Sequence, residues 1–373
     1  MKVLHSQFLI LDYIMVACKI CSKKSELIST SLPICIDCIR EGSERSLKII
    51  ERSHKDSRAS FDLPHKPPKN GKVECPMCGN QCRMEDGEYG FCGLRYAKSG
   101  HLRTKGVGWL DWYYDPLPTN CVASFCCAGC TESGYPKFSY ADGPEYRYKN
   151  LAVFYRACSF DCLFCQNYHF RESLGKRVSP EELLEKVDER TSCVCFFGGD
   201  PSPQINHTIR FAEKAKEKQR KLRICWETNG SMQLPYLKKI TKIALESGGC
   251  IKFDLKAYDE KLNYALCGVS NKTTIDNFGH VSHFISERPN PPLLIASTLL
   301  VPGYIDVKEI KRIAKFIAQF NPKIPYSLLC FHPQFYFRDI PVTSRELAYE
   351  AYDAALKEGL TNVHIGNKHL LLL

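Results

Sequence analysis

Residues 155–167 read YRACSFDCLFCQN and hold three cysteines, Cys158, Cys162 and Cys165, directly after the apolar run 151–155. The spacing Cys-x3-Cys-x2-Cys puts three thiolates on a short loop that leaves a predicted strand. A four-iron cubane has four corners, and clusters held by cysteine alone take a thiolate at each corner. A loop with three thiolates leaves one iron open, as a catalytic zinc keeps an open position. The spacing therefore predicts a catalytic iron–sulfur cluster.

Two aromatic residues of this loop, Phe160 and Phe164, alternate with the cysteines and would shield a cluster from water. The competing interpretation is a structural zinc loop that takes its fourth ligand from elsewhere, for example from His169.

The sequence around this loop alternates between strand-like and helix-like segments. The apolar, strand-like runs are 151–157, 193–197, 222–226, 251–255, 293–300, 326–331 and 362–365. Apolar residues recur at i, i+3 and i+4 in 180–187, 208–218, 234–245, 307–320 and 344–357, which predicts helices. Alternation of this kind indicates a parallel sheet, and about six or seven repeats fall short of the eight of a full barrel. We therefore predict an α/β fold, a partial (β/α)6-type open TIM-like barrel with its site at the strand carboxyl ends.

Helix ends in this region carry recognisable signals. Ser179 and Pro180 fit an N-cap and a first turn. Thr343 and Glu346 have the spacing of a capping box, and Gly359 fits the end of the last helix.

Three regions are predicted along the chain. Residues 1–70 form a zinc-knuckle-like region with a linker, 71–150 a second cysteine-rich region, and 151–373 the barrel. The polar, basic segment 44–70 ends in several prolines and lacks apolar periodicity, so we expect a helix tail that runs into a linker.

The regions before the barrel are rich in possible metal ligands. Two Cys-x2-Cys pairs predict a tetrahedral structural zinc, with the ligands Cys18, Cys21, Cys35 and Cys38. A second set of four can close around one metal or one cubane, and consists of Cys75, Cys78, Cys82 and Cys92. These ligands leave zinc and an auxiliary four-iron cluster both open.

A third group of thiols is ambiguous, and consists of Cys121, Cys126, Cys127 and Cys130. Its spacing suits a metal, but two adjacent cysteines fit one site poorly. Free cysteines also occur as small buried hydrophobic residues, so both interpretations stay open.

Polar and glycine residues stand at the ends of the second and third predicted strands. Gly198 and Gly199 would let a ligand approach the backbone, and Asp200 follows them. Asn229 can hydrogen-bond ribose or carboxylate oxygens. Taken alone, the glycine pair is an ordinary turn.

Two later strands also end in ionisable residues. Asp254 and Lys256 alternate on one strand, so both point to the barrel interior, where they need each other or a ligand. His332 could orient a ligand or transfer a proton, although a hydrogen-bonded histidine at the barrel mouth is an equal alternative.

Together these motifs resemble the radical S-adenosylmethionine (SAM) superfamily, and within it the relatives of pyruvate formate-lyase-activating enzyme. The sequence is most similar to the AmmeMemoRadiSam-type branch, because it shares the cysteine segment 75–95 and the C-terminal segment 331–367. The extra cysteines at 18–38 and the segment 121–130 depart from that pattern.

The resemblance implies a [4Fe–4S] cluster on Cys158, Cys162 and Cys165 whose open iron binds SAM, with Lys256 reaching its carboxylate. It implies that the residues holding SAM are Gly198, Gly199, Asp200, Asn229, Asp254, Lys256 and His332. One-electron reduction would cleave SAM to a 5′-deoxyadenosyl radical that abstracts hydrogen from a substrate.

Composition limits the partners and the location. The chain has 373 residues, 21 cysteines and a formal net charge of +10. No aromatic-interleaved basic motif occurs, so nucleic acid is an unlikely partner. The apolar run 8–17 is too short to span a bilayer, and cysteine pairs without a secretory signal fit metal ligation in a reducing cytoplasm.

We therefore predict a cytoplasmic radical SAM oxidoreductase that receives electrons from a ferredoxin or flavodoxin and acts on a protein or peptide. The alternatives are a radical C-methyltransferase or another modifier of protein, lipid or RNA. A zinc-rich interaction protein without enzymatic activity is the alternative of a different class.

Overall fold

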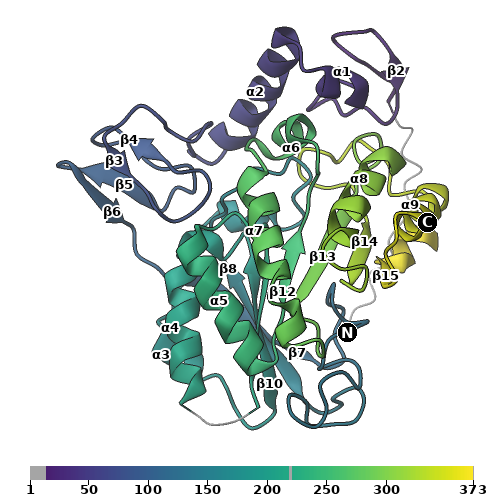
Figure 1. Cartoon of the computed structure of the whole chain (residues 1–373). Coiled ribbons are helices and arrows are strands. Elements are labelled where there is room, and N and C mark those ends of the chain that lie inside the picture. Colours follow the sequence, from purple (N-terminus) through teal and green to yellow (C-terminus); the bar gives the residue numbers. More distant parts are fainter. Residues whose placement is uncertain (1–13, 218–220, 373) are drawn as a thin grey trace, which may run out of the picture.

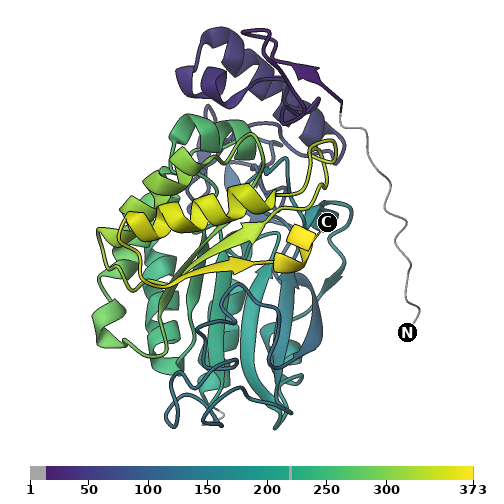
Figure 2. The ribbon, with the colours of Figure 1, turned by 90° about the vertical axis from the view of Figure 1, so that its right-hand side faces the viewer.

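The structure is a computed structural model that describes residues 14–217 and 221–372. Its centre is a nine-stranded sheet with the strand order β15-β14-β13-β12-β11-β10-β8-β7-β9 (Figures 1 and 2). Seven neighbouring strands run parallel: β8 (Lys149–Tyr155), β10 (Thr191–Gly198), β11 (Arg223–Thr228), β12 (Ile251–Asp254), β13 (Leu294–Leu300), β14 (Tyr326–Cys330) and β15 (Val363–Gly366). Each of the seven predicted apolar runs coincides with one of them.

The sheet remains open because its end strands, β15 and β9, do not pair with each other in the described chain. Two antiparallel strands extend the β8 edge, namely β7 (Trp109–Pro116) and β9 (Lys176–Arg177). The predicted partial, open barrel is therefore confirmed.

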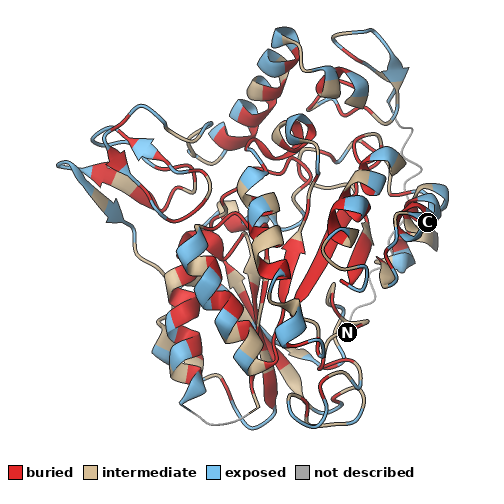
Figure 3. Ribbon diagram, in the orientation of Figure 1, coloured by how far each residue is buried: buried red, intermediate tan, exposed pale blue. Residues whose placement is uncertain are grey.

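Helices cover the outside of the sheet, and their solvent-facing sides are exposed while the strands β8 and β10 to β14 are mostly buried (Figure 3). They are α3 (Pro180–Leu184), α4 (Ile205–Lys216), α5 (Leu234–Ser247), α6 (Glu260–Cys267), α7 (Lys272–Ser282), α8 (Val307–Ala318) and α9 (Arg345–Lys357). Short 3-10 turns lie at Tyr168–Arg171, Ser202–Gln204, Ile285–Glu287 and Lys368–Leu372. The five predicted helices are present, whereas α6 and α7 were not predicted.

One predicted helix start is wrong by a residue. Ser344, rather than Thr343, caps α9 and accepts a hydrogen bond from the amide of Leu347 at 3.1 Å. The Thr343 hydroxyl instead accepts from the Phe331 amide and donates to the Leu300 carbonyl, both at 2.7 Å. Thr343 therefore joins the ends of two strands, and the capping box with Glu346 does not form. The predicted N-cap of α3, Ser179, is confirmed, and it also forms a capping box with Glu182 that was not predicted.

The N-terminal region lies above the carboxyl ends of the strands (Figure 1). It contains β1 (Val16–Ala17), β2 (Lys24–Ser25), α1 (Ile36–Glu41) and α2 (Glu44–Ala59). Residues 44–59 thus form a full helix, longer than the predicted helix tail, and the residues from 60 to 72 after it contain no helix or strand. Its buried face is mostly polar, including Ser53, His54 and Ser57, which explains the missing apolar periodicity. Most of the apolar run 8–17 lies outside the described residues.

The second cysteine-rich region, residues 71–150, begins with two hairpins. They pair β3 (Val73–Glu74) with β4 (Arg83–Met84) and β5 (Arg95–Lys98) with β6 (His101–Thr104). Residues 117–148 follow β7, contain no helix or strand, and run below the amino ends of the barrel strands (Figure 1). In the described residues, no helix is long and apolar enough to cross a membrane.

Candidate active site

A pocket of about 150 Å³ opens at the carboxyl ends of the central strands. Its lining includes every residue predicted for the SAM site except His332: Cys158, Cys162, Cys165, Gly198, Gly199, Asp200, Asn229, Asp254 and Lys256. The exposed His332 side chain places Nδ1 3.0 Å from the Pro333 carbonyl oxygen and is not part of the lining. The structure therefore does not bring His332 to this pocket.

The loop of the three cysteines is compact. The amide of Cys165 donates to the carbonyl of Cys162 at 3.1 Å, and the amide of Phe160 donates to Cys158 Sγ at 3.3 Å. Phe160 and Phe164 are buried at the pocket wall, as expected for side chains that exclude water. Burial raises the pKa of the Cys165 thiol to about 11, so metal binding at neutral pH would displace its proton.

The spacing of these sulfur atoms bears on what they can hold. Zinc–sulfur bonds of about 2.3 Å place the ligands of one tetrahedral ion about 3.8 Å apart. In the described residues, the three loop cysteines do not form a group of ligand atoms within 4.8 Å of one another. The wider spacing fits a polynuclear cluster better than a single ion.

A buried carboxylate, Asp161, holds the cysteine loop from behind. It contacts His54 Nδ1 of α2 at 2.8 Å, the Ser57 hydroxyl at 3.3 Å, and the guanidinium of Arg171. Burial alone would raise the pKa of the Asp161 carboxyl, but the charge of Arg171 and the hydrogen bond from His54 hold it well below its usual value. The carboxylate is therefore ionised, and it ties the loop to the N-terminal helix.

Glycine is required where the second strand ends against the cysteine loop. Gly198 has φ +111°, and a Cβ there would lie 2.6 Å from the backbone nitrogen of Tyr155. A Cβ on Gly199 would lie 2.3 Å from the Ala157 carbonyl oxygen. Both positions thus allow a close backbone approach, which keeps polar backbone groups at the pocket surface.

Asp200 is occupied by protein groups. Its carboxylate accepts from the amides of Ser202 and Asn229, both at 2.7 Å, and from the Thr228 hydroxyl at 3.0 Å. Asn229 in turn donates through Nδ2 to the Ser159 hydroxyl at 2.9 Å, beside the first loop cysteine. Asp200 therefore positions the loops after β10 and β11 and has little capacity left for a ligand.

The end of β12 and the residues after it supply an ion pair in which one carboxylate oxygen has no hydrogen-bond partner in the described structure. Lys256 Nζ contacts Asp254 Oδ2, one of the two partners that the sequence left open, and both side chains line the pocket. Asp254 Oδ1 is buried without a hydrogen-bond partner in the described structure. A buried, unpaired carboxylate oxygen is costly and is the kind of atom that a ligand donor satisfies. The pocket thus fits a ligand with both a cationic and an anionic group.

Several residues around the pocket were not predicted. Arg171 and Glu227 line it, and His54 reaches the cysteine loop from α2. Glu227 lies two residues before Asn229, so its place at a strand end could have indicated a site. His54 and Arg171 have no comparable local signal.

The N-terminal cysteines form a tighter group. The ligand atoms of Cys18, Cys21, Cys35 and Cys38 all lie within 4.8 Å of one another, and Cys21 Sγ is 3.7 Å from Cys35 Sγ. These distances agree with one tetrahedral ion.

The second cysteine set, Cys75, Cys78, Cys82 and Cys92, does not form such a group in the described structure. Its hairpin nevertheless contacts the barrel closely, because Asn80 Nδ2 donates to the Ser159 carbonyl of the cysteine loop at 2.7 Å. The Gly79 amide donates to the Ser231 carbonyl at 2.8 Å.

Comparison with known families decides the assignment. Residues 152–317 match the family model of the radical SAM superfamily. The chain carries a radical SAM domain. This match begins in β8, which leads into the cysteine loop, and ends in α8.

Relatives with similar sequences include named activating enzymes. A putative glycyl-radical enzyme activating enzyme of Methanocaldococcus jannaschii is 30% identical over 177 residues, covering 46% of this chain and 63% of the relative. Pyruvate formate-lyase 1-activating enzyme of Escherichia coli is 28% identical over 198 residues, covering 51% and 76%. An uncharacterised protein of M. jannaschii is 24% identical over 310 residues, covering 80% and 82%.

The solved structures that match the chain are more distant. A domain of pyruvate formate-lyase-activating enzyme from Bacteroides vulgatus is 21% identical with a TM-score of 0.38, over 47% of this chain and 98% of that one. Streptococcus suis SuiB bound to its precursor peptide SuiA is 17% identical with a TM-score of 0.48, over 60% and 50%.

The cofactors of a radical SAM domain are a [4Fe–4S] cluster and SAM, which together supply one-electron cleavage of SAM. The pocket fits them, because it offers three separated thiols, a lysine ammonium and an unpaired carboxylate oxygen. A ligand amine would satisfy Asp254 Oδ1, and a ligand carboxylate would meet Lys256.

Proposed function

We propose that this radical SAM enzyme abstracts a hydrogen atom from a protein or peptide, as activating enzymes do. One observation carries the proposal: the three loop cysteines, the glycine pair and the Asp254–Lys256 pair line one pocket. The relatives named as activating enzymes support a polypeptide substrate.

Each group in the pocket has a proposed task. Cys158, Cys162 and Cys165 bind the cluster and leave one iron for SAM. Lys256 binds the SAM carboxylate, and Asp254 accepts a hydrogen bond from its amine. Asp200 and Asn229 act as positioning residues, because their polar atoms hold the loops after β10 and β11 in place.

Exclusion of water protects the radical until it meets the substrate. Phe160 and Phe164 are 2% exposed and form an apolar wall beside the cysteines. A dry, apolar wall favours transfer from the bound substrate over side reactions. An electron must enter from outside, and we propose a ferredoxin or flavodoxin as its donor.

The remaining cysteine sets have structural tasks in this proposal. Cys18, Cys21, Cys35 and Cys38 bind zinc. Cys75, Cys78, Cys82 and Cys92 bind a second metal or cluster.

Transfer of deuterium tests the choice of substrate. The source organism is grown on deuterated medium, and its extract is separated by ultrafiltration into a macromolecular and a small-molecule fraction. The loaded enzyme is incubated anaerobically with SAM, dithionite and each fraction. We expect deuterium in 5′-deoxyadenosine with the macromolecular fraction, and expect protease treatment of that fraction to abolish it. Deuterium transferred only from the small-molecule fraction, or from the protease-resistant part, would overturn the proposed substrate class.

A further inference from the structure

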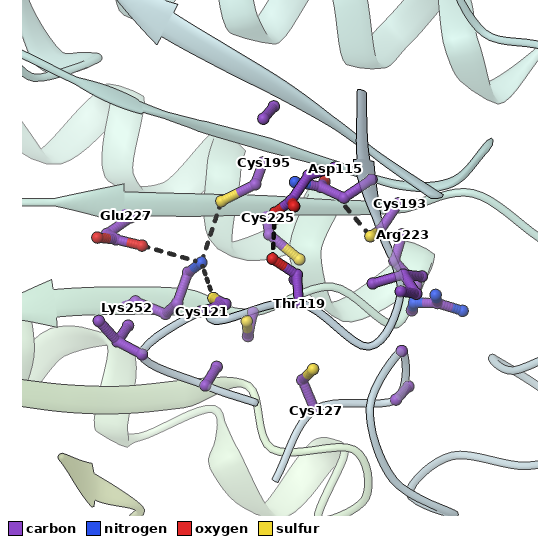
Figure 4. A pocket seen from close by; sticks show the side chains of 18 of the residues that line it. Asp115, Thr119, Cys121, Cys127, Cys193, Cys195, Arg223, Cys225, Glu227 and Lys252 are labelled. Atoms are coloured by element: carbon purple, nitrogen blue, oxygen red, sulfur yellow. Dashed lines mark hydrogen bonds and ion pairs between the residues drawn. The ribbon is translucent and has the colours of Figure 1, made fainter. Parts of the chain in front are cut away.

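A second cavity, of about 180 Å³, is lined by the barrel strands and by residues of the segment 117–148, and Figure 4 shows it from close by. Its wall contains six cysteines, which we call the cysteine chamber: Cys121, Cys127, Cys193, Cys195, Cys225 and Cys250. In the described part of the chain, these thiols form no disulfide. They belong neither to the active-site loop nor to the two N-terminal cysteine sets.

Three of these cysteines stand side by side on neighbouring strands. Cys195 of β10 is the register partner of Cys225 of β11, and Trp226 bonds through its amide to the carbonyl of Cys250, which directly precedes β12. Parallel strands lie about 4.8 Å apart, so residues in one register form a row at that spacing. All three side chains line the same cavity, and the sheet therefore presents a row of thiols to the barrel interior.

The other wall comes from the segment 117–148. Cys121 and Cys127 of this segment face the strand cysteines across the cavity (Figure 4). The segment is held there by a buried ion pair, in which Arg223 of β11 contacts Glu145 at 2.6 Å. Thiols from both walls can therefore contact one bound ligand.

Charge in the chamber complements thiolates. Lys252 is only 2% exposed, and its Nζ lies 3.0 Å from both Cys121 Sγ and Cys195 Sγ and 3.2 Å from a Glu227 carboxylate oxygen (Figure 4). A buried ammonium is costly unless negative charge surrounds it. Thiolates bound to a metal would supply that charge together with Glu227.

Simple packing does not explain this arrangement. A buried cysteine that serves as a small hydrophobic residue fills space. Here the thiols line a cavity of the same order as one of about 150 Å³ that accepts benzene. A single preformed zinc site does not explain it either, since no three of these ligand atoms form a group within 4.8 Å in the described structure.

We propose that the cysteine chamber binds a second iron–sulfur cluster through Cys195, Cys225 and Cys250, with Cys121 and Cys127 closing it from the covering segment. Bridging iron and sulfide separate the ligand sulfurs, which suits their spread around a cavity. Phe197 and Glu227 line both this chamber and the active site, so the two centres would share one wall. The proposal does not depend on the substrate of the enzyme.

Iron analysis of two matched variants tests the proposal. Both lack the active-site ligands through Cys158/Cys162/Cys165→Ala, and one of them also carries Cys195/Cys225/Cys250→Ser. After anaerobic reconstitution with iron and sulfide, we expect the second variant to hold about two to four fewer iron atoms per chain, with a matching loss of sulfide. A cluster at Cys75–Cys92 would remain in both variants, so the difference isolates the chamber.

Cys330→Ser in the same background is the control, because Cys330 is a fully buried strand cysteine outside the chamber lining. It should leave the iron content unchanged. Equal iron and sulfide contents in the active-site variant with and without Cys195/Cys225/Cys250→Ser would overturn the proposal. A difference between them in zinc content alone would also overturn it.

A milder change covers the case in which the chamber variant does not fold. Cys121/Cys127→Ala alters only the covering segment and leaves the strands intact. In the active-site-depleted background, it should change or abolish the electron paramagnetic resonance signal of the reduced second cluster. An unchanged signal with unchanged iron content would overturn the proposal by itself.

Discussion

At the scale of single residues, Cys267 offers a direct test of how the protein adjusts its active-site centre. Cys267 Sγ lies 3.5 Å from Cys162 Sγ, is fully buried, and is not part of the pocket lining. Its thiol can donate a hydrogen bond to a Cys162 thiolate, and such bonds to ligand sulfurs raise the reduction potential of a cluster.

Cys267→Ala should therefore lower the reduction potential of the active-site cluster, on the order of tens of millivolts for the loss of one weak hydrogen bond. Redox titration followed by electron paramagnetic resonance measures this shift. Cys267→Ser keeps a donor and should stay near the wild-type potential. A potential that is equal in the Ala and Ser variants would contradict the assigned role.

Glu145 gives a second prediction at this scale. Its carboxylate pairs with Arg223 in the protein interior, with both side chains almost fully buried. Glu145→Ala leaves the buried Arg223 guanidinium without its carboxylate partner and should lower the free energy of unfolding by about 3 kcal/mol. Urea unfolding measures the change.

The double variant Glu145→Ala/Arg223→Met should recover part of that loss, since it removes the stranded charge. Glu246→Ala is the surface control, because Glu246 pairs with the exposed Lys216 at 2.8 Å, and it should have little effect. A double variant less stable than Glu145→Ala would contradict the account of the pair.

The sequence predicted that the loop cysteines and the strand-end residues would line one pocket, because each of them belongs to a short local motif. It could not identify His54, which lies 107 positions before its partner Asp161, because such a contact exists only after folding. It placed His332 at the pocket because the residue follows a strand, yet that side chain points to solvent.

At the scale of elements, a buried histidine joins β8 to α4. His207 Nδ1 lies 2.6 Å from the Tyr155 hydroxyl, and Nε2 lies 2.8 Å from the Val178 carbonyl oxygen. The carbonyl requires a proton on Nε2, which leaves Nδ1 to accept from tyrosine, so the ring is neutral. Burial lowers the pKa of His207 to about 4.

The free energy of unfolding should therefore decrease as the pH is lowered. Below the unfolded-state pKa of about 6.5 the unfolded chain binds a proton that the folded chain excludes until about pH 4. Between pH 7.5 and 5.5 the free energy of unfolding should drop by about 1 kcal/mol from this residue. Anaerobic urea unfolding at the two values, beside a His207→Gln variant, measures it. An equal drop in the variant would show that other groups cause it.

Strands and helices could be predicted where their buried residues form a continuous apolar run or recur at helical spacing. The parallel strands are continuous apolar runs, as in β13, where every residue is buried. The full length of α2 was not predicted, because this helix buries serines and a histidine against polar partners. The cysteine chamber as a whole was not predicted, because strand register decides that Cys195 and Cys225 become neighbours. Its signals in the sequence were the spacing of Cys121 and Cys127 and the alternation of Cys193 and Cys195.

At the scale of the whole molecule, the helices that follow the N-terminal cysteine group contact the barrel. Arg40 of α1 contacts Asp306 at 2.8 Å, at the start of α8, while His54 of α2 holds the cysteine loop. The predicted zinc would thus hold α1 and α2 in place, and with them the contact between His54 and Asp161 of the cysteine loop.

Loss of that metal should loosen α2. Cys35/Cys38→Ser should remove one metal ion per chain and speed amide hydrogen exchange in residues 44–59. Exchange in α5 serves as the internal reference and should not change. Wild-type protection of α2 in the metal-free variant would contradict the proposed support.

Formation of 5′-deoxyadenosine tests the radical SAM assignment most directly. The anaerobically reconstituted enzyme is incubated with SAM and dithionite, beside the Cys158/Cys162/Cys165→Ala variant and the Cys330→Ser control. We predict 5′-deoxyadenosine and methionine from the wild type and the control, and none from the triple variant. A wild-type protein that holds a full complement of iron yet forms no 5′-deoxyadenosine, or a triple variant that still forms it, would contradict radical SAM chemistry at this site.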